Sequence, residues 1–166
     1  MEYEIREACP EDGAQLIEYV KKIGGETNNL TFGSEGMVAT LEQETELLKS
    51  QQIDPKSTRI LAWNNGEIIG DGILRSMPRR MNHRVEMGLS VAKDYWNQGV
   101  GQALLDRLIE YAREHDIEII QLDVRSDNVR ATHIYEKYGF RKIGNYPRFL
   151  KIGSEYVDFD MMVLQL

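Results

Sequence analysis

Two glycines at the start of an amphipathic helix are the first feature of this sequence that could bind a ligand. An extended apolar run, 85–91, leads to Gly99 and Gly101. Beyond them, apolar residues recur at the spacing of one helix face: Leu104, Leu105, Leu108, Ile109 and Ala112. The first turn of a helix carries unpaired N–H groups and the positive end of the helix dipole. This stretch therefore predicts an anion site, best suited to phosphate or pyrophosphate.

The glycine motif by itself leaves the ligand open. It lacks the Gly-Lys-Ser/Thr ending of a P-loop and has an incomplete set of the glycines of the dinucleotide-binding fingerprint. A dinucleotide-binding enzyme is therefore a distant alternative. Glycines that serve only the packing of a helix start are another alternative.

A second motif spans the next predicted helix and runs into the strand after it. It contains Asn128, Ala131, Tyr135, Gly139 and Phe140 in the pattern Asn-x-x-Ala-x-x-x-Tyr-x-x-x-Gly-Phe. The glycine loop and this motif, in this order, resemble the GNAT superfamily of N-acetyltransferases. The resemblance extends over roughly residues 60–145.

The resemblance implies that acetyl-CoA is the donor cosubstrate and that main-chain groups hold it. Trp96 stands where the family has glutamine or arginine, but the family's contact there is largely through the backbone, so Trp96 stays in the predicted site. The main-chain N–H groups of Leu89 and Val91 match the positions at which the family polarises the thioester carbonyl. Asn128 caps its helix and, in the family, also helps to hold the pantetheine arm. The diphosphate is expected on the N–H groups of Asn97, Gln98, Gly99, Val100, Gly101 and Gln102.

The resemblance also implies an acid and a base. Tyr135 occupies the family's general-acid position, and a phenol with a pKa near 10 can donate a proton at neutral pH. Tyr138 is expected to pack at the helix end. Glu86 lies where several family members place a carboxylate base, and His83 is a second candidate further from the site. Spacing alone leaves open that the tyrosine only packs and that the glutamate is only solvated.

The elements that must position these residues follow from periodicity and turn residues. We expect Gly24-Gly25 to end the first helix, Thr40 to cap the second with Gln43, and Asn65-Gly66 to form a hairpin turn between two strands. The glycines at 70 and 72 suggest a bulge or bend. Strands are predicted near 3–8, 59–63, 67–74, 82–91, 118–124, 140–150 and 156–164, and helices near 10–23, 41–53, 99–114 and 128–138.

This order predicts an α/β (mixed α+β) fold, with a twisted mixed sheet of about six to seven strands and about four helices, in one domain over residues 1–166. The strand–helix–strand unit 85–124 should be parallel and right-handed. The GNAT resemblance implies that its two central strands splay apart around the pantetheine arm.

The composition of the chain argues against several classes of function. A net charge of −7 argues against broad nucleic-acid binding. No apolar run is long enough to span a membrane, and the N-terminus does not resemble a signal peptide. Cys9 is the only cysteine, which fits a cytoplasmic protein without a disulfide. No His or Cys spacing suggests a metal site.

We therefore expect an N-acetyltransferase that acts on the primary amine of a small molecule by direct attack in a ternary complex. The alternatives are a protein N-terminal or lysine acetyltransferase and a non-catalytic acyl-CoA sensor. Acceptor contacts are expected from residues 26–36, 76–82 and 146–156. A homodimer is possible, since family members often form one.

Overall fold

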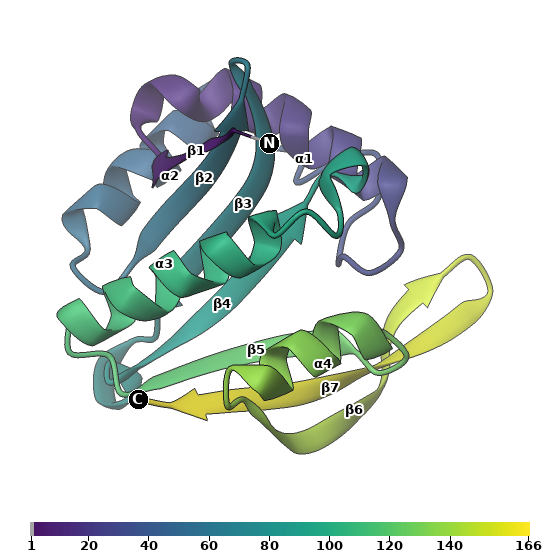
Figure 1. Cartoon of the computed structure of the whole chain (residues 1–166). Coiled ribbons are helices and arrows are strands. Elements are labelled where there is room, and N and C mark those ends of the chain that lie inside the picture. Colours follow the sequence, from purple (N-terminus) through teal and green to yellow (C-terminus); the bar gives the residue numbers. More distant parts are fainter. Residues whose placement is uncertain (1) are drawn as a thin grey trace.

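A seven-stranded mixed sheet forms the centre of the computed structural model, which describes residues 2–166. The strands follow the order β1-β2-β3-β4-β5-β7-β6, and β4 and β5 run parallel (Figure 1). The strands are β1 (Glu4–Glu7), β2 (Thr58–Asn64), β3 (Glu67–Ser76), β4 (Arg84–Val91), β5 (Ile119–Arg125), β6 (Arg141–Ile152) and β7 (Glu155–Gln165). The α-helices are α1 (Gly13–Glu26), α2 (Leu41–Ile53), α3 (Val100–Glu114) and α4 (Val129–Lys137). The expected fold class is confirmed.

Local turn and cap chemistry accounts for several element boundaries. Asn65 and Gly66 have φ angles of 49° and 80°, as a tight hairpin turn requires. At the start of α2, the Gln43 N–H donates to Thr40 Oγ1 at 3.2 Å, and the Thr40 N–H donates to Gln43 Oε1 at 2.9 Å. The predicted hairpin and capping box are confirmed. The β2–β3 register also shifts beside Gly70, as a bulge would.

The first helix does not end where the sequence suggested. α1 runs through Gly24 and Gly25 to Glu26. A Cβ atom on Gly24 would lie 1.9 Å from the carbonyl oxygen of Gly33. The glycine at 24 therefore allows the loop between α1 and α2 to pack directly against the helix, rather than ending the helix.

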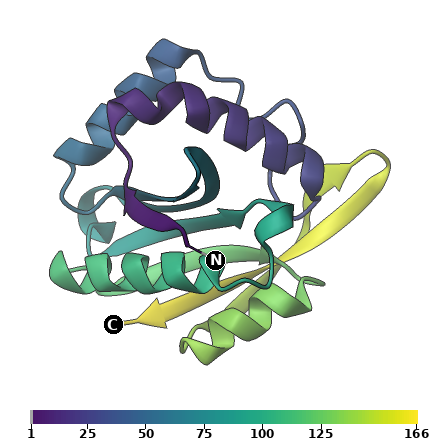
Figure 2. The same ribbon diagram turned by 45° about the horizontal axis from the view of Figure 1, so that its top comes forward.

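Apolar cores lie on both faces of the sheet. Alternation along β2 sends Ile60 to the face covered by α3 and Leu61 to the face covered by α1 and α2. Leu104 and Leu108 of α3 are buried in the first core, and Leu16 of α1 is buried in the second. Figure 2 shows α1 and α2 on one side of the sheet and α3 and α4 on the other.

Candidate active site

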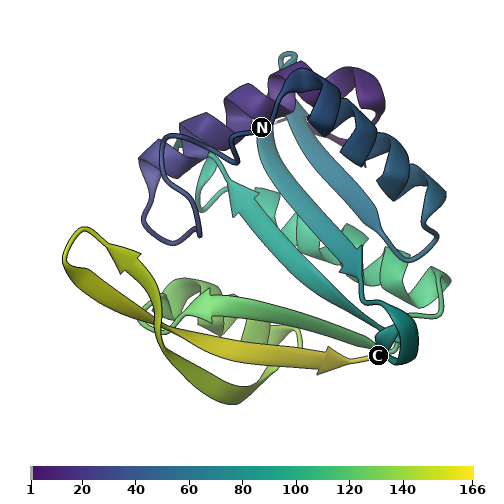
Figure 3. The same ribbon diagram turned by 180° about the vertical axis from the view of Figure 1, so that it is seen from behind.

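The sheet opens where β4 and β5 stop pairing. These parallel strands are in register from Arg84 with Ile119 to Glu86 with Gln121, and beyond this point the two halves of the sheet diverge (Figure 3). A helix-end cavity of about 460 Å³ lies against the loop 97–102. A sheet-face cavity of about 530 Å³ lies between β2–β5 and the loop that joins α1 to α2. The described residues that line both are Ile23, Asn29, Leu30, Leu89, Ser90, Asn128, Ala131 and Tyr135.

The start of α3 presents unpaired N–H groups to the helix-end cavity. Gly99 has a φ of 84°, in the left-handed region, and precedes the helix. The first main-chain bond of the helix runs from the Ala103 N–H to the Gly99 carbonyl, at 3.0 Å. The N–H groups of Val100, Gly101 and Gln102 therefore have no acceptor within the helix. These residues line the helix-end cavity together with Asn97 and Gly99, so one wall of the cavity favours an anion.

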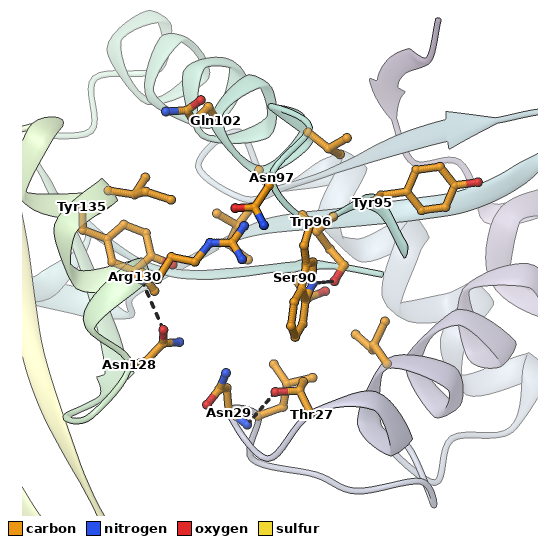
Figure 4. Close-up of a pocket in the computed structure, with 18 of the residues that line it drawn as sticks. Thr27, Asn29, Ser90, Tyr95, Trp96, Asn97, Gln102, Asn128, Arg130 and Tyr135 are labelled. Carbon is orange, nitrogen blue, oxygen red and sulfur yellow. Dashed lines mark hydrogen bonds between the residues drawn. The ribbon is translucent and has the colours of Figure 1, made fainter. Parts of the chain in front are cut away.

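Two members of the predicted loop have side-chain partners that the sequence did not indicate. The Trp96 indole N–H donates to the carbonyl oxygen of Val91 at 2.7 Å, and the Arg130 guanidinium lies 5.8 Å from the Trp96 ring centre. Trp96 and Arg130 both line the helix-end cavity (Figure 4). Gln98 lines neither cavity, and its side chain donates to the Asp94 carbonyl at 2.7 Å.

Two residues of β4 direct their main-chain N–H and carbonyl groups toward the gap that opens between β4 and β5. The Ala92 N–H donates to the Ile69 carbonyl of the preceding β3 at 2.9 Å. Pairs that exchange hydrogen bonds alternate along an antiparallel ladder, so the main chain of Ser90 also bonds toward β3. The N–H and carbonyl groups of Leu89 and Val91 consequently point toward β5, where the strands have separated. Both residues line the helix-end cavity.

Tyr135 lies at the junction of the two cavities. It projects from α4 toward the cavity (Figure 4), and its ring packs against Phe140 with the ring centres 5.6 Å apart. Burial raises the pKa of the Tyr135 phenol to about 12. Asn128 caps α4, as expected, by accepting a hydrogen bond from the Ala131 N–H at 3.2 Å. The phenol is therefore protonated at neutral pH and faces both cavities.

Tyr138 and the second base candidate, His83, lie outside both cavities. The Tyr138 hydroxyl donates to Asp106 Oδ1 at 2.8 Å and joins α4 to α3, which agrees with its predicted packing role. His83 precedes β4 at the end where β4 and β5 are paired. Neither residue lines either cavity.

Two carboxylates from the separating strands share the sheet-face cavity. Glu86 on β4 and Asp123 on β5 are half-buried, and neither side chain has a hydrogen-bond or ion-pair partner within residues 2–166. Burial, followed by the negative charge of Glu86, raises the pKa of the Asp123 carboxyl above its ordinary value. Sequence reasoning identified Glu86 but missed Asp123. The alternation of polar Gln121, Asp123 and Arg125 with buried neighbours was the available signal.

A buried ion network forms another part of the sheet-face cavity wall. Arg59 on β2 donates to both carboxylate oxygens of Asp71 on β3, at 2.9 and 2.7 Å, and to Glu44 of α2 at 3.0 Å. Desolvation opposes the charge of Arg59, but the two carboxylates outweigh it and raise its pKa. The ion pairs of Arg59 with Asp71 and Glu44 thus connect α2 to β2 and β3 of the sheet.

The structure also bears on a metal site, a membrane-spanning helix and the predicted acceptor loop 76–82. The described residues contain no group of three or more His, Cys, Asp or Glu side chains arranged to hold a metal ion. None of the helices formed by residues 2–166 has the length and apolar character needed to cross a membrane. Residues 76–82, expected to contact an acceptor, line neither cavity.

Residues 15–140 match the model of the acetyltransferase (GNAT) family. A solved GNAT-family acetyltransferase from Streptococcus pneumoniae is 30% identical, with a TM-score of 0.96 over 99% of this chain and 100% of that one. The structure of yncA from Salmonella typhimurium, solved with acetyl-CoA, is 19% identical, with a TM-score of 0.85 over 98% of this chain and 93% of that one. That second likeness shows the fold alone.

Curated relatives match over shorter segments. The L-amino acid N-acetyltransferase AaaT of Escherichia coli (strain K12) is 31% identical over 107 residues, which are 63% of this chain and 65% of that protein. Streptothricin acetyltransferase A of Bacillus subtilis (strain 168) is 42% identical over 52 residues, 31% of this chain and 30% of that protein. The chain thus spans less than two thirds of the length of these relatives.

Proposed function

Because the chain belongs to the acetyltransferase (GNAT) family, we propose that it transfers the acetyl group of acetyl-CoA to the primary amine of a small molecule, by direct attack in a ternary complex. The observation that carries this proposal is that Leu89 and Tyr135 line both cavities. A donor in the helix-end cavity and an acceptor in the sheet-face cavity would meet between these two residues.

The helix-end cavity has the groups that acetyl-CoA requires. The N–H groups at the start of α3 and the left-handed turn at Gly99 suit the diphosphate. The main-chain groups of Leu89 and the N–H of Val91, which point away from β3, suit the amide-bearing pantetheine arm, with Asn128 also lining the cavity. Arg130 adds a positive charge at this cavity in a protein whose net charge is −7.

The chemistry requires two proton movements and one polarised carbonyl. The amine nitrogen attacks the thioester carbon, the C–N bond forms, and the C–S bond breaks. Leu89 and Val91 offer N–H groups for the developing oxyanion. Tyr135 donates its phenolic proton to the leaving thiolate, and the Glu86–Asp123 pair takes the proton that the amine loses. Glu86, the predicted base, thus acts beside a second carboxylate.

The size of the sheet-face cavity supports a small-molecule acceptor. Its volume of about 530 Å³ lies within the usual range for small-ligand sites. The name of AaaT, an L-amino acid N-acetyltransferase, is consistent with an amine of this size. A protein acceptor would instead require an open groove for a peptide chain.

Initial rates of coenzyme A release test this proposal, with acetyl-CoA and the amine both varied. A ternary complex gives intersecting double-reciprocal lines, whereas a covalent acyl-enzyme gives parallel lines and would contradict direct attack. Thermal melting with acetyl-CoA supplies an independent measure of donor binding, because a ligand of the folded state raises the midpoint. A melting shift without turnover on any amine would favour a sensor.

A further inference from the structure

Large apolar side chains are exposed along one edge of the sheet-face cavity. Met37 and Val38 in the loop between α1 and α2, and Leu47 on α2, line this cavity with exposed fractions of 60%, 80% and 45%. Val38 has a φ of 49°, a costly conformation for a β-branched residue. We call these three residues the loop edge. A group of exposed apolar side chains beside a cavity is typical of a binding surface.

The opposite edge is aromatic. Phe149 on β6 is half-buried and lines the same cavity. Its ring packs against Phe159, with ring centres 4.6 Å apart, and against Tyr146 at 5.1 Å. Figures 1 and 3 show the β6–β7 hairpin and the loop between α1 and α2 facing each other across the opened sheet. We call Tyr146 and Phe149 the hairpin edge.

Most charges of the cavity lie deeper, on or against the strands, while Lys21 of α1 and Glu35 of the α1–α2 loop are two exposed lining residues of opposite charge. Arg59, Asp71 and Glu44 neutralise one another in part and are held by direct ion pairs. Among the described residues that line this cavity, the strand carboxylates without a side-chain partner are Glu86 and Asp123, which do not line the helix-end cavity. Arg75 lies across from Glu86 on β3, but it is exposed and has no ion pair with any described residue. The strands therefore offer a place for one cationic group, and the cavity edges offer apolar contacts.

We propose that the acceptor is a monoamine with an apolar body. Its ammonium group binds at Glu86 and Asp123, which take one proton from it so that the neutral nitrogen can attack the thioester, and its alkyl or aryl part lies between the loop edge and the hairpin edge. A second ammonium at the far end of such a molecule would lie among Met37, Leu47 and Phe149, apolar side chains that supply no hydrogen-bond acceptor in place of the water that they displace. This inference rests on the proposed function, because it assigns the sheet-face cavity to the acceptor.

Calorimetric titration of amines into the complex of the protein with coenzyme A tests the inference without turnover. Propylamine, pentylamine and heptylamine supply a chain-length series, and 1,5-diaminopentane adds a second ammonium to the same five-carbon chain as pentylamine. We expect affinity to rise about twofold to fourfold for each added methylene that the edges bury. We expect 1,5-diaminopentane to bind at least roughly tenfold more weakly than pentylamine.

Paired variants test whether the rise of affinity with chain length comes from the loop edge. The double substitution Met37→Ser with Leu47→Ser should flatten the chain-length series, while Leu41→Ser should not. Leu41 is a matched control, because it is 54% exposed on the same helix as Leu47 but does not line the cavity. All three side chains are exposed, so these variants are expected to fold.

The outcomes separate this inference from the proposed function. Equal affinities along the series, preference for the diamine, or no amine binding to the coenzyme A complex would each overturn the inference. Amines that bind in the expected order but are never acetylated would overturn the proposed function and leave only the preference of the cavity for apolar monoamines standing. Acetylation that favours dicationic amines would overturn the inference and leave the proposed function standing.

Discussion

The indole N–H of Trp96 donates to the carbonyl oxygen of Val91 at 2.7 Å. This bond joins the loop that precedes α3 to the last residue of β4, at the point where the sheet opens. It fixes the two walls of the helix-end cavity relative to each other. The same indole ring lies near the guanidinium of Arg130 on α4, so three separate segments meet around Trp96.

Replacing Trp96 by phenylalanine should weaken donor binding. The substitution keeps an aromatic ring but removes the N–H, and a typical hydrogen bond contributes about 1 kcal/mol, so we expect the Kd for acetyl-CoA to rise roughly fivefold. Trp63→Phe is the matched control, because the buried Trp63 N–H has no hydrogen-bond partner within the described chain. Equal donor affinities in the two variants would show that the Trp96 bond does not shape the cavity.

Replacing Tyr135 by phenylalanine should slow acetyl transfer and spare donor binding. Loss of a general acid typically lowers a rate by about 10²-fold or more, and the phenylalanine ring retains the contact with Phe140. Tyr138→Phe, which removes the bond to Asp106, should lower stability slightly and leave kcat nearly unchanged. Steady-state rates and calorimetric Kd values for both variants check this. A Tyr135→Phe enzyme with normal kcat would exclude the phenol as the acid.

The Glu86–Asp123 pair should control the acidic side of the pH–rate profile. The base works in its deprotonated form, so kcat/KM should rise with pH through the raised pKa of Asp123. Glu86→Gln removes the neighbouring negative charge, so the remaining Asp123 midpoint should move to lower pH. Asp123→Asn should remove this limb and lower kcat/KM at least roughly tenfold. An acidic limb that keeps its position in both variants would exclude the pair.

Asp123→Asn should also stabilise the fold at neutral pH. Because folding raises the pKa of Asp123, the folded state binds this proton more tightly than the unfolded state. The carboxyl therefore destabilises the fold as pH rises above its ordinary pKa, and it makes no difference well below that value. We expect the Tm of Asp123→Asn to exceed that of the wild type at pH 7 but not at pH 3. A higher Tm at both pH values would indicate a packing effect instead.

Alanine substitutions at the two glycines of the α3 loop should have opposite effects on stability. Gly99 has a φ of 84° and open space around its Cβ position, so Gly99→Ala should cost about 1–2 kcal/mol through backbone strain alone. Gly101 lies within α3, where a Cβ would meet Val91 Cγ2 at an ordinary 3.5 Å, so Gly101→Ala should stabilise the helix by up to about 1 kcal/mol. Urea unfolding of both variants compares them. Destabilisation by Gly101→Ala would mean that the helix start is more tightly packed than this spacing indicates.

The sequence by itself determined the features that depend on neighbours within a few residues. The spacing of Leu104, Leu105 and Leu108 predicted α3 because one helix face repeats at that interval. Asn65-Gly66 predicted its turn, and Thr40 with Gln43 predicted its cap, because both use contacts between adjacent residues. The position of Tyr135 followed from a family motif confined to residues 128–140. Each of these signals is local.

Only the tertiary structure decided which distant residues share a cavity. Asp123 joins Glu86 because β5 lies beside β4 and then diverges from it, and no local pattern records that divergence. The glycine at 24 suggested a helix end, but it serves the contact with Gly33 in the loop after α1. That contact cannot be seen from the residues next to Gly24 in the sequence. The loop edge and the hairpin edge come from opposite ends of the sequence. Contacts of this kind depend on how whole elements pack, and packing is a property of the complete fold.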